Sequence, residues 1–280
     1  MSYHTFIAPA AAFENLQNPD YRFVDCSYAL ADKSWGRNEF NKAHIPGAIY
    51  ADLHDDLSGT ITPGVTGRHP LPGKEELVQR LYTFGIDSNT QVVAYDSTAG
   101  FMAAARLWWL LKWAGHENVA VLAGGKQAWD EQGFPLTSEI ISPAPKVFNA
   151  NFHDELLADA DEVAALVNSG NYNGCLIDSR TADRYAGQNE TIDPVAGHIP
   201  TAISKPFNAQ LNAQGGVADA AVLKEHFAPD FAKGEVIFYC GSGVTAAFNV
   251  LLAVHAGYTF PKLYAGSWSE WITDPQRPVA

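Results

Sequence analysis

The residues best suited by type and spacing to carry out a reaction lie at 240–245 (CGSGVT). They stand between the apolar run 235–239 and an apolar helical pattern. Cys240 is therefore expected at the carboxyl end of a buried strand, the edge at which open α/β sheets bind ligands. Gly241 and Gly243 allow successive backbone N–H groups to form an anion-binding nest, and the following helix start adds partial positive charge. These features predict a stabilised, nucleophilic Cys240 thiolate. The alternative is an inert buried cysteine, a common fate for free Cys residues.

The chain repeats the same pattern of motifs. The residues His-Ile-Pro begin at His44 and return at His198. A spacing of about 150 residues is far longer than a solenoid repeat and matches one ordinary domain. The sequence therefore predicts a duplicated domain, with 1–136 as the first copy, the proline-containing 137–151 as a linker and 152–280 as the second copy.

Short β-rich runs alternate with longer helical patterns in both copies, which is typical of an α/β fold. Strands are expected at 22–25, 91–95 and 119–122, and again at 175–178, 235–239 and 262–264. Helices are expected at 74–84, 101–114, 159–168 and 244–256, ending at or near Gly85, Gly115, Gly170 and Gly257. We therefore predict that each domain is a mostly parallel sheet covered by helices on both faces.

Composition and charge exclude several classes of protein. With 280 residues, 47% of them hydrophobic and 18% charged, the chain is an ordinary globule. The net charge of −13 makes nucleic acid and anionic membrane surfaces unlikely partners, because both are negatively charged. The apolar stretch 244–256 is shorter than the ~20 residues of a membrane span. The first 13 residues lack the order of a secretory signal, and three cysteines suit free thiols, so we expect a cytoplasmic protein.

The segment 240–245 resembles the active loop of the tandem-domain rhodaneses, and more closely that of the 3-mercaptopyruvate sulfurtransferases among them. Thiosulfate-using relatives more often carry CRKGVT at this place. The resemblance covers nearly the whole chain and includes 178–180 (DSR), both His-Ile-Pro patterns and 266–271 (GSWSEW). It implies two tandem rhodanese-like domains. Because Asp96 aligns with Cys240, it also implies that the first domain is catalytically inactive.

The family resemblance implies a sulfur transfer in two steps. Cys240 would take the sulfur of 3-mercaptopyruvate as a persulfide with release of pyruvate, and would pass it to a thiol acceptor such as thioredoxin or a small thiol, or to cyanide. This chemistry requires no metal or organic cofactor, and the sequence shows no clustered Cys/His ligand spacing.

The resemblance also implies a set of site residues. Ser242 and His69 match the serine and histidine of a catalytic relay, although a turn serine and a solvated loop histidine are the alternatives. Arg184 matches the arginine that binds the substrate carboxylate, whereas Arg180 is expected in a structural ion pair. The resemblance further implies that the remaining loop residues, Gly241, Gly243, Val244 and Thr245, bind the substrate.

Three other functions are alternatives to a 3-mercaptopyruvate sulfurtransferase. A cysteine phosphatase needs Arg six residues after the cysteine, where this chain has Ala246. A persulfide carrier for a specific protein partner stays open. Thiosulfate is the second candidate donor: the uncharged Gly241 and Ser242 argue against a dianion, but residues 188–197 contain no second arginine of the kind that mercaptopyruvate enzymes usually supply.

Overall fold

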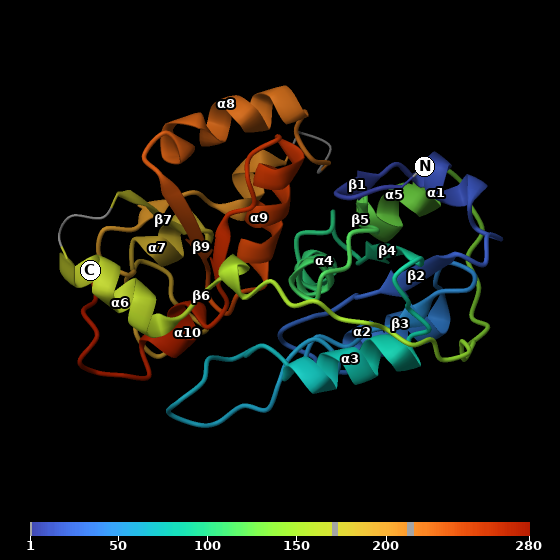
Figure 1. The fold of residues 1–280 in the computed structure, drawn as a ribbon, viewed down its shortest axis with the longest axis horizontal. Helices are drawn as coiled ribbons and strands as arrows, with labels where there is room; N and C mark the ends of the chain where they lie inside the picture. Colours follow the sequence, from blue (N-terminus) through green and yellow to red (C-terminus); the bar gives the residue numbers. More distant parts are fainter. Residues whose placement is uncertain (1, 170–172, 212–215) are drawn as a thin grey trace. The chain divides into compact units, whose positions relative to one another are not determined.

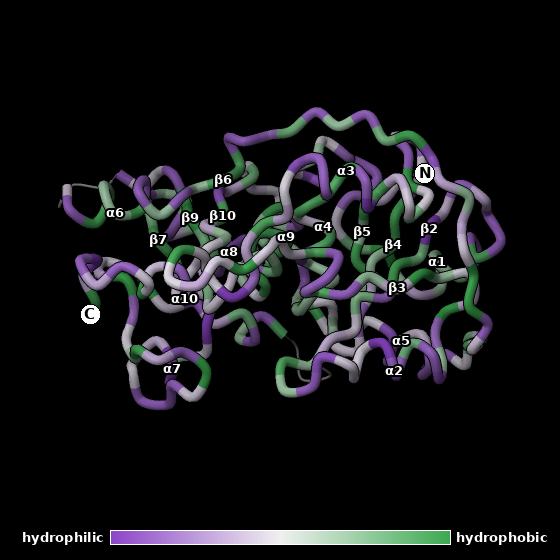
Figure 2. Tube along the Cα trace, turned by 90° about the horizontal axis from the view of Figure 1, so that it is seen from below, coloured by the Kyte–Doolittle hydropathy of each residue, from purple (hydrophilic) through white to green (hydrophobic). Residues whose placement is uncertain are grey.

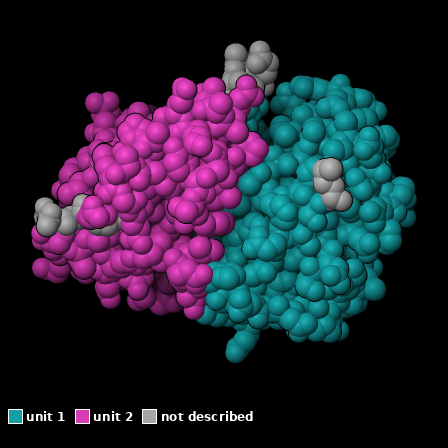
Figure 3. All heavy atoms as spheres, turned by 45° about the horizontal axis from the view of Figure 1, so that its top comes forward, with its two compact units in different colours: residues 1–59, 72–153, 213–217 teal, residues 60–71, 154–212, 218–280 magenta. Residues whose placement is uncertain are grey.

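The computed structural model describes residues 2–169, 173–211 and 216–280, and it divides into two compact units. Unit 1 consists mainly of Met1–Gly59 and Pro72–His153, and unit 2 of Thr60–Leu71, Asp154–Asn212 and Ala218–Ala280 (Figure 3). The segment Thr60–Leu71 thus groups with the second unit, although it lies early in the chain. Residues 137–151 group with unit 1, where Thr137 forms an isolated antiparallel bridge with His44.

Unit 1 contains a five-stranded parallel sheet in the order β1-β5-β4-β2-β3 (Figure 1). Its strands are β1 (Phe6–Ile7), β2 (Tyr21–Asp25), β3 (Ile49–Tyr50), β4 (Gln91–Tyr95) and β5 (Val119–Leu122). Its helices are α1 (Pro9–Glu14), α2 (Trp35–Lys42), α3 (Lys74–Thr83), α4 (Ala103–Trp113) and α5 (Gly125–Glu131). One core cluster packs Trp129, which is fully buried, with Phe23 and Tyr95.

Unit 2 repeats this sheet in the order β6-β10-β9-β7-β8. Its strands are β6 (Leu157–Ala158), β7 (Gly174–Asp178), β8 (Ile203–Ser204), β9 (Glu235–Tyr239) and β10 (Lys262–Tyr264). Its α-helices are α6 (Ala160–Ser169), α7 (Ala182–Tyr185), α8 (Ala220–Phe231), α9 (Thr245–His255) and α10 (Ser267–Trp271), and its 3-10 turns are η1 (Asp154–Leu156) and η2 (Phe207–Gln210).

The two units are built alike, strand for strand, which confirms the predicted duplication. Every strand pairing within the two described sheets is parallel, and the order of one becomes the order of the other when five is added to each strand number. The backbone N–H of Ile45 donates to the Tyr95 hydroxyl at 3.2 Å, and that of Ile199 donates to the Tyr239 hydroxyl at 3.1 Å. Each His-Ile-Pro pattern is therefore tied to the last residue of its central strand.

The His44 and His198 side chains contact backbone carbonyl oxygens near the two His-Ile-Pro patterns, which indicates a structural role. Both ring nitrogens of His44 lie within hydrogen-bond distance of backbone carbonyl oxygens, those of Phe40 at 2.6 Å and Glu139 at 3.0 Å. His198 Nδ1 makes the same kind of contact with the carbonyl of Tyr185 at 2.9 Å.

The predicted long elements are present with ends shifted by at most two residues. The structure adds the two-residue strands β1, β3, β6 and β8, and the helices α1, α2, α5, α7, α8 and α10. Gly85, Gly115 and Gly257 follow α3, α4 and α9 with positive φ, as expected, whereas Gly170 lies outside the described residues. Two residues are too few for a hydrophobic period, so the edge strands carry no signal of their own.

The centre of unit 2 is formed by β9 and α9, which explains why both were visible in the sequence. The strand β9, whose residue hydropathy is coloured in Figure 2, is β-branched and aromatic. It is buried from Val236 to Tyr239, as a central parallel strand must be. The helix α9 is buried from Ala246 to Ala253, and all of these residues are apolar except Asn249. None of the helices in the described ranges is long and apolar enough to cross a membrane.

We predict that Tyr95→Phe and Tyr239→Phe each lower the free energy of unfolding by about 1–3 kcal/mol. Each change removes the oxygen that accepts a buried backbone N–H, that of Ile45 or Ile199, and leaves this donor unpaired. Urea denaturation followed by circular dichroism measures the loss. Tyr82→Phe, at a partly exposed helical tyrosine, is the control. Losses no larger than that of the control would contradict this role of the two hydroxyl groups.

Candidate active site

Cys240 is the first residue after β9, which lies between β7 and β10 in the sheet. Its side chain is therefore at the carboxyl end of a central parallel strand, the predicted position. The residue is only 2% exposed, and its thiol is free rather than in a disulfide.

The backbone of the loop is held by α10. The N–H groups of Trp268 and Ser269 donate to the carbonyl oxygens of Cys240 and Gly241 at 3.0 and 2.9 Å, and the Cys240 N–H donates to the Ser267 hydroxyl at 3.1 Å. Two successive carbonyl oxygens are thus turned toward α10. This arrangement fixes the orientation of the peptide groups beside the cysteine before any ligand binds.

Gly243 is the residue that turns the loop into α9. Its φ is +72°, and a methyl group added there would lie 2.4 Å from the carbonyl oxygen of Ala265. Both the left-handed backbone and the close approach require glycine. Val244 and Thr245 then begin the helix, with Val244 buried and Thr245 half-buried.

The equivalent loop of unit 1 holds an anion of its own. Asp96 follows β4 as Cys240 follows β9, and its carboxylate accepts five hydrogen bonds. Four come from backbone N–H groups, those of Thr98, Gly100, Met102 and Ala104, and the fifth comes from the Thr98 hydroxyl. Burial raises the pKa of Asp96, although these donors oppose the shift. A strand-to-helix loop of this fold is therefore able to surround one negative side chain with backbone donors.

The structure brings His69 and Ser242 together within unit 2. His69 Nδ1 lies 2.8 Å from the Ser242 hydroxyl, and both residues are buried. The segment carrying His69 is anchored next to it, since the Arg68 N–H donates to the Ser269 hydroxyl at 3.0 Å. At Gly67 an added methyl group would lie 2.6 Å from the Gly266 carbonyl oxygen, so a larger residue would push this segment away.

Arg184, on the short helix α7, lies against the loop but already has two acidic partners. Its guanidinium donates to Glu190 at 2.9–3.2 Å and to Asp193 at 2.9 Å. A methyl group added at Gly241 would lie 3.5 Å from Nη1 of Arg184. The predicted arginine is therefore beside the active loop, but held by carboxylates that the sequence analysis did not consider.

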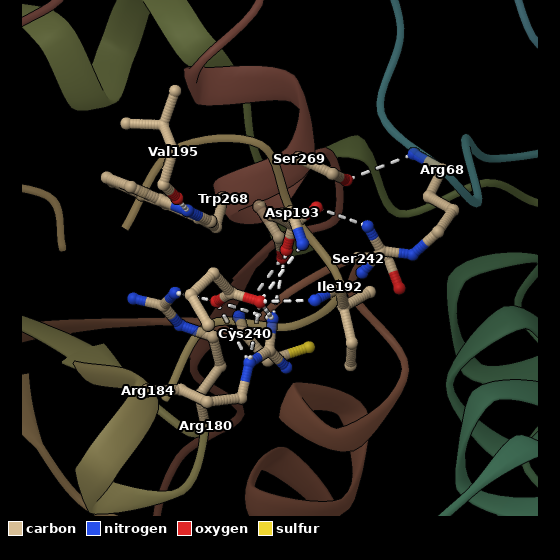
Figure 4. Close-up of polar contacts among 12 residues, drawn as sticks. Arg68, Arg180, Arg184, Ile192, Asp193, Val195, Cys240, Ser242, Trp268 and Ser269 are labelled. Carbon is tan, nitrogen blue, oxygen red and sulfur yellow. Dashed lines mark hydrogen bonds and ion pairs between the residues drawn. The ribbon is translucent and has the colours of Figure 1, made fainter. Parts of the chain in front are cut away.

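Sequence reasoning missed Arg68. Its Nη1 donates to Asp193 (Figure 4). Its Nη2 would lie 3.0 Å from a methyl group at Gly241. The available signal was its position next to His69. The charge argument against thiosulfate was accordingly incomplete: Gly241 is uncharged, but two guanidinium groups lie against it.

These residues form a series of alternating charges, which we name the charge ladder. It runs in the order Asp178, Arg180, Glu190, Arg184, Asp193, Arg68. Arg180 donates to Asp178 at 2.7–3.1 Å and is fully buried, so the expected structural ion pair is confirmed. Burial alone would raise the pKa of Glu190, but hydrogen bonds from the Asp193 N–H and from Arg184 outweigh it and lower that pKa.

The other two cysteines lie in settings that disfavour a thiolate. Burial, followed by the charge of Asp25, raises the pKa of Cys26 well above its usual value. Burial and the neighbouring Asp230 raise the pKa of Cys175 to about 11. Both therefore remain protonated thiols at neutral pH.

Comparison with known proteins places this architecture in a family. The family model described as "Rhodanese-like domain" matches twice, over residues 9–132 and 159–274. The chain belongs to the rhodanese-like family. The two matches correspond to the two sheets, so this rhodanese-like protein is a tandem of the domain.

Relatives cover almost the entire chain. A probable 3-mercaptopyruvate sulfurtransferase of Pseudomonas aeruginosa is 44% identical, over 95% of this chain and 94% of its own length. A putative thiosulfate sulfurtransferase, SseB of Mycobacterium tuberculosis, is 37% identical over 89% and 87%. The structure of a 3-mercaptopyruvate sulfurtransferase from Leishmania major superimposes with a TM-score of 0.82 and 31% identity, over 96% of this chain and 74% of that one.

We predict that Gly243→Ala destabilises this rhodanese-like protein more than Gly257→Ala does. Both glycines have positive φ, which costs alanine about 1–2 kcal/mol. Only Gly243 also meets a backbone oxygen, whereas nothing lies within 4 Å of a methyl group at Gly257. The extra clash should add roughly 1–3 kcal/mol, measured by urea denaturation. Equal losses in the two variants would show that the loop relaxes around the added methyl group.

Proposed function

We propose that this protein is a sulfurtransferase that takes sulfur from 3-mercaptopyruvate, holds it as a persulfide on Cys240 and delivers it to a thiol or to cyanide. The observation that carries the proposal is the position of Cys240 at the carboxyl end of β9, in a loop whose backbone α10 holds in place. Similarity over 95% of the chain to a probable 3-mercaptopyruvate sulfurtransferase supports the choice of donor.

In the first half-reaction the Cys240 thiolate attacks the thiol sulfur of the donor. A sulfur–sulfur bond forms while the carbon–sulfur bond of the donor breaks, and its electron pair leaves on carbon as the enolate of pyruvate. One proton converts this enolate to pyruvate. We assign the backbone N–H groups of Gly241, Gly243, Val244 and Thr245 to stabilising the negative charge that develops on the sulfur. The loop of unit 1 supports this assignment, because backbone N–H groups of Thr98 and Gly100 donate to the Asp96 carboxylate.

In the second half-reaction an acceptor thiolate, or cyanide, attacks the outer sulfur of the persulfide. The sulfur–sulfur bond breaks and its electron pair returns to Cys240, which regenerates the thiolate. Two side chains are suited to handle the proton of the first half-reaction. His69 Nδ1 lies 2.8 Å from the Ser242 hydroxyl, and this pair can pass on the proton that the pyruvate enolate takes up. Arg184 orients the donor by its carboxylate, since a guanidinium offers two parallel donors.

Thiosulfate is the second candidate donor. Two guanidinium groups lie against Gly241, and they provide positive charge for a dianion without the basic residues of a CRKG loop. A putative thiosulfate sulfurtransferase that is 37% identical over 89% of the chain points the same way. A persulfide carrier for one protein partner is the third candidate, and continuous turnover with small donors and thiols separates it from an enzyme.

We predict that Cys240→Ser lowers the rate of sulfur transfer roughly a thousandfold or more, because the nucleophile is lost. Steady-state rates of pyruvate release from 3-mercaptopyruvate and of sulfite release from thiosulfate, measured side by side, test this and rank the donors. Intact-mass analysis of the donor-treated protein should show one added sulfur, absent in the variant.

Cys175→Ser is the matched control, because Cys175 is also a buried free cysteine but has a raised pKa. It should keep its activity and its added sulfur. Retained activity in Cys240→Ser would refute the assignment of the nucleophile. A single loading without further turnover would favour the carrier.

We predict that Arg184→Lys raises the Michaelis constant for 3-mercaptopyruvate about tenfold, while that for thiosulfate changes less. Lysine keeps the positive charge toward Glu190 and Asp193 but loses the paired donors that match a carboxylate. Steady-state kinetics with both donors measures the split. Equal changes for the two donors would remove the assigned role of Arg184.

A further inference from the structure

Two guanidinium groups lie against the loop 240–245 at Gly241, although only Arg184 was predicted from the sequence as a substrate-binding residue. A methyl group on Gly241 would meet Nη2 of Arg68 at 3.0 Å and Nη1 of Arg184 at 3.5 Å. Arg184 comes from α7 and Arg68 from the early segment Thr60–Leu71, and both belong to unit 2. The space next to Cys240 that a side chain at 241 would take is therefore bordered by two cations.

Asp193 holds both cations from one side. Its Oδ1 accepts from Nη1 of Arg68 and its Oδ2 from Nη2 of Arg184, and its side chain is only 2% exposed (Figure 4). A methyl group at Gly241 would be closest to Nη2 of Arg68, at 3.0 Å, and would lie 3.5 and 3.6 Å from Nη1 and Nη2 of Arg184. Nη2 of Arg68 and Nη1 of Arg184 are the terminal nitrogens of these groups that do not bind Asp193. A buried carboxylate that bridges two arginines in this way orients their remaining N–H groups in a common direction.

Arg68 has further hydrogen-bonding capacity. Its Nε is buried and has no hydrogen-bond partner among the described residues, and its side chain is 23% exposed. An arginine with five N–H donors that spends one nitrogen on Asp193 retains donors for a second anion. Residues 188–197, where a second arginine is missing, instead supply Glu190 and Asp193 as acceptors.

We propose that Arg68 is a substrate-binding residue, the second guanidinium of the site for the donor carboxylate, and that Asp193 positions it together with Arg184. This inference rests on the proposed sulfur transfer and adds a residue to its donor site. The carboxylate of an α-keto acid is held by N–H groups from two arginines beside Gly241, which leaves its β-carbon and sulfur directed to Cys240. The arginine lacking in residues 188–197 is thereby replaced in space by one from Thr60–Leu71.

Binding to a protein that cannot react tests the inference. In the Cys240→Ser background, pyruvate is titrated by isothermal calorimetry against Arg68→Ala, Arg68→Lys and the parent. We expect Arg68→Ala to raise the dissociation constant of pyruvate about tenfold or more, because a charge-assisted hydrogen bond is lost. Arg68→Lys should give an intermediate value. Hydroxyacetone, a ketone without the carboxylate, should show no difference among the three proteins.

Arg80→Ala is the matched control, since Arg80 also pairs with an aspartate, Asp56 at 3.2 Å, but lies in unit 1. Its pyruvate binding should equal that of the parent. Combining Arg68→Ala with Arg184→Lys should weaken pyruvate binding by less than the product of the single effects, because both side chains hold the same group. Thermal unfolding of every variant identifies any that fail to fold, and Arg68→Lys then carries the test.

Three results would overturn the inference. Unchanged pyruvate binding in both Arg68 variants is the first. The second is an effect confined to thiosulfate titrated in the same background, which would assign Arg68 to a dianion. The third is a fall in kcat with both donors in the reactive protein, without any change in pyruvate affinity, which would mean that Arg68 only anchors His69. Failure of the proposed function would appear elsewhere, as retained activity in Cys240→Ser.

Discussion

The structure depends on one constraint: the loop that leaves the central strand must keep its backbone rigid before a negative charge arrives. In unit 2 this is achieved by the N–H groups of Trp268 and Ser269, which bind the carbonyl oxygens of the loop, and by Gly243, whose φ of +72° no other residue would tolerate at that contact. Donors fixed in advance need no reorganisation during a reaction, which is where preorganised sites gain most. The loop is held by β9 before it, by α9 after it and by α10, which donates to its carbonyl oxygens.

The duplication shows what the constraint permits. Both units carry a loop at the same place, directly after the central strand, but in unit 1 the carboxylate of Asp96 accepts hydrogen bonds from the backbone of its own loop. An internal anion of this kind stabilises the loop and leaves no room for a thiolate. In unit 2 the residue at this position is Cys240, a free cysteine whose sulfur can form and lose a covalent bond. Unit 1 thus has a carboxylate where unit 2 has a thiol, and the proposed sulfur transfer is assigned to unit 2.

The positive charge near the loop 240–245 comes from the arginines of the charge ladder, because the loop itself contains no basic residue. Three arginines alternate with three carboxylates from Asp178 to Arg68, so the row is neutral as a whole while its last members present N–H groups to Gly241. Buried ions are costly unless paired, and pairing here also aims them. The net charge of the protein is −13, and under the proposed function these local guanidinium groups are what would attract an anionic donor to Cys240.

The sequence by itself determined the duplicated α/β fold and the positions of Cys240, Asp96 and the central strands, because long buried strands, apolar helices and repeated motifs are local patterns. It did not reveal the two-residue edge strands, which are too short for any period. Only the tertiary structure decided that Arg68 joins Arg184 at Gly241 and that Asp193 links them. Arg68 is 125 residues before Asp193 in the chain, and only the folding of Thr60–Leu71 within unit 2 brings these two charges within hydrogen-bond distance.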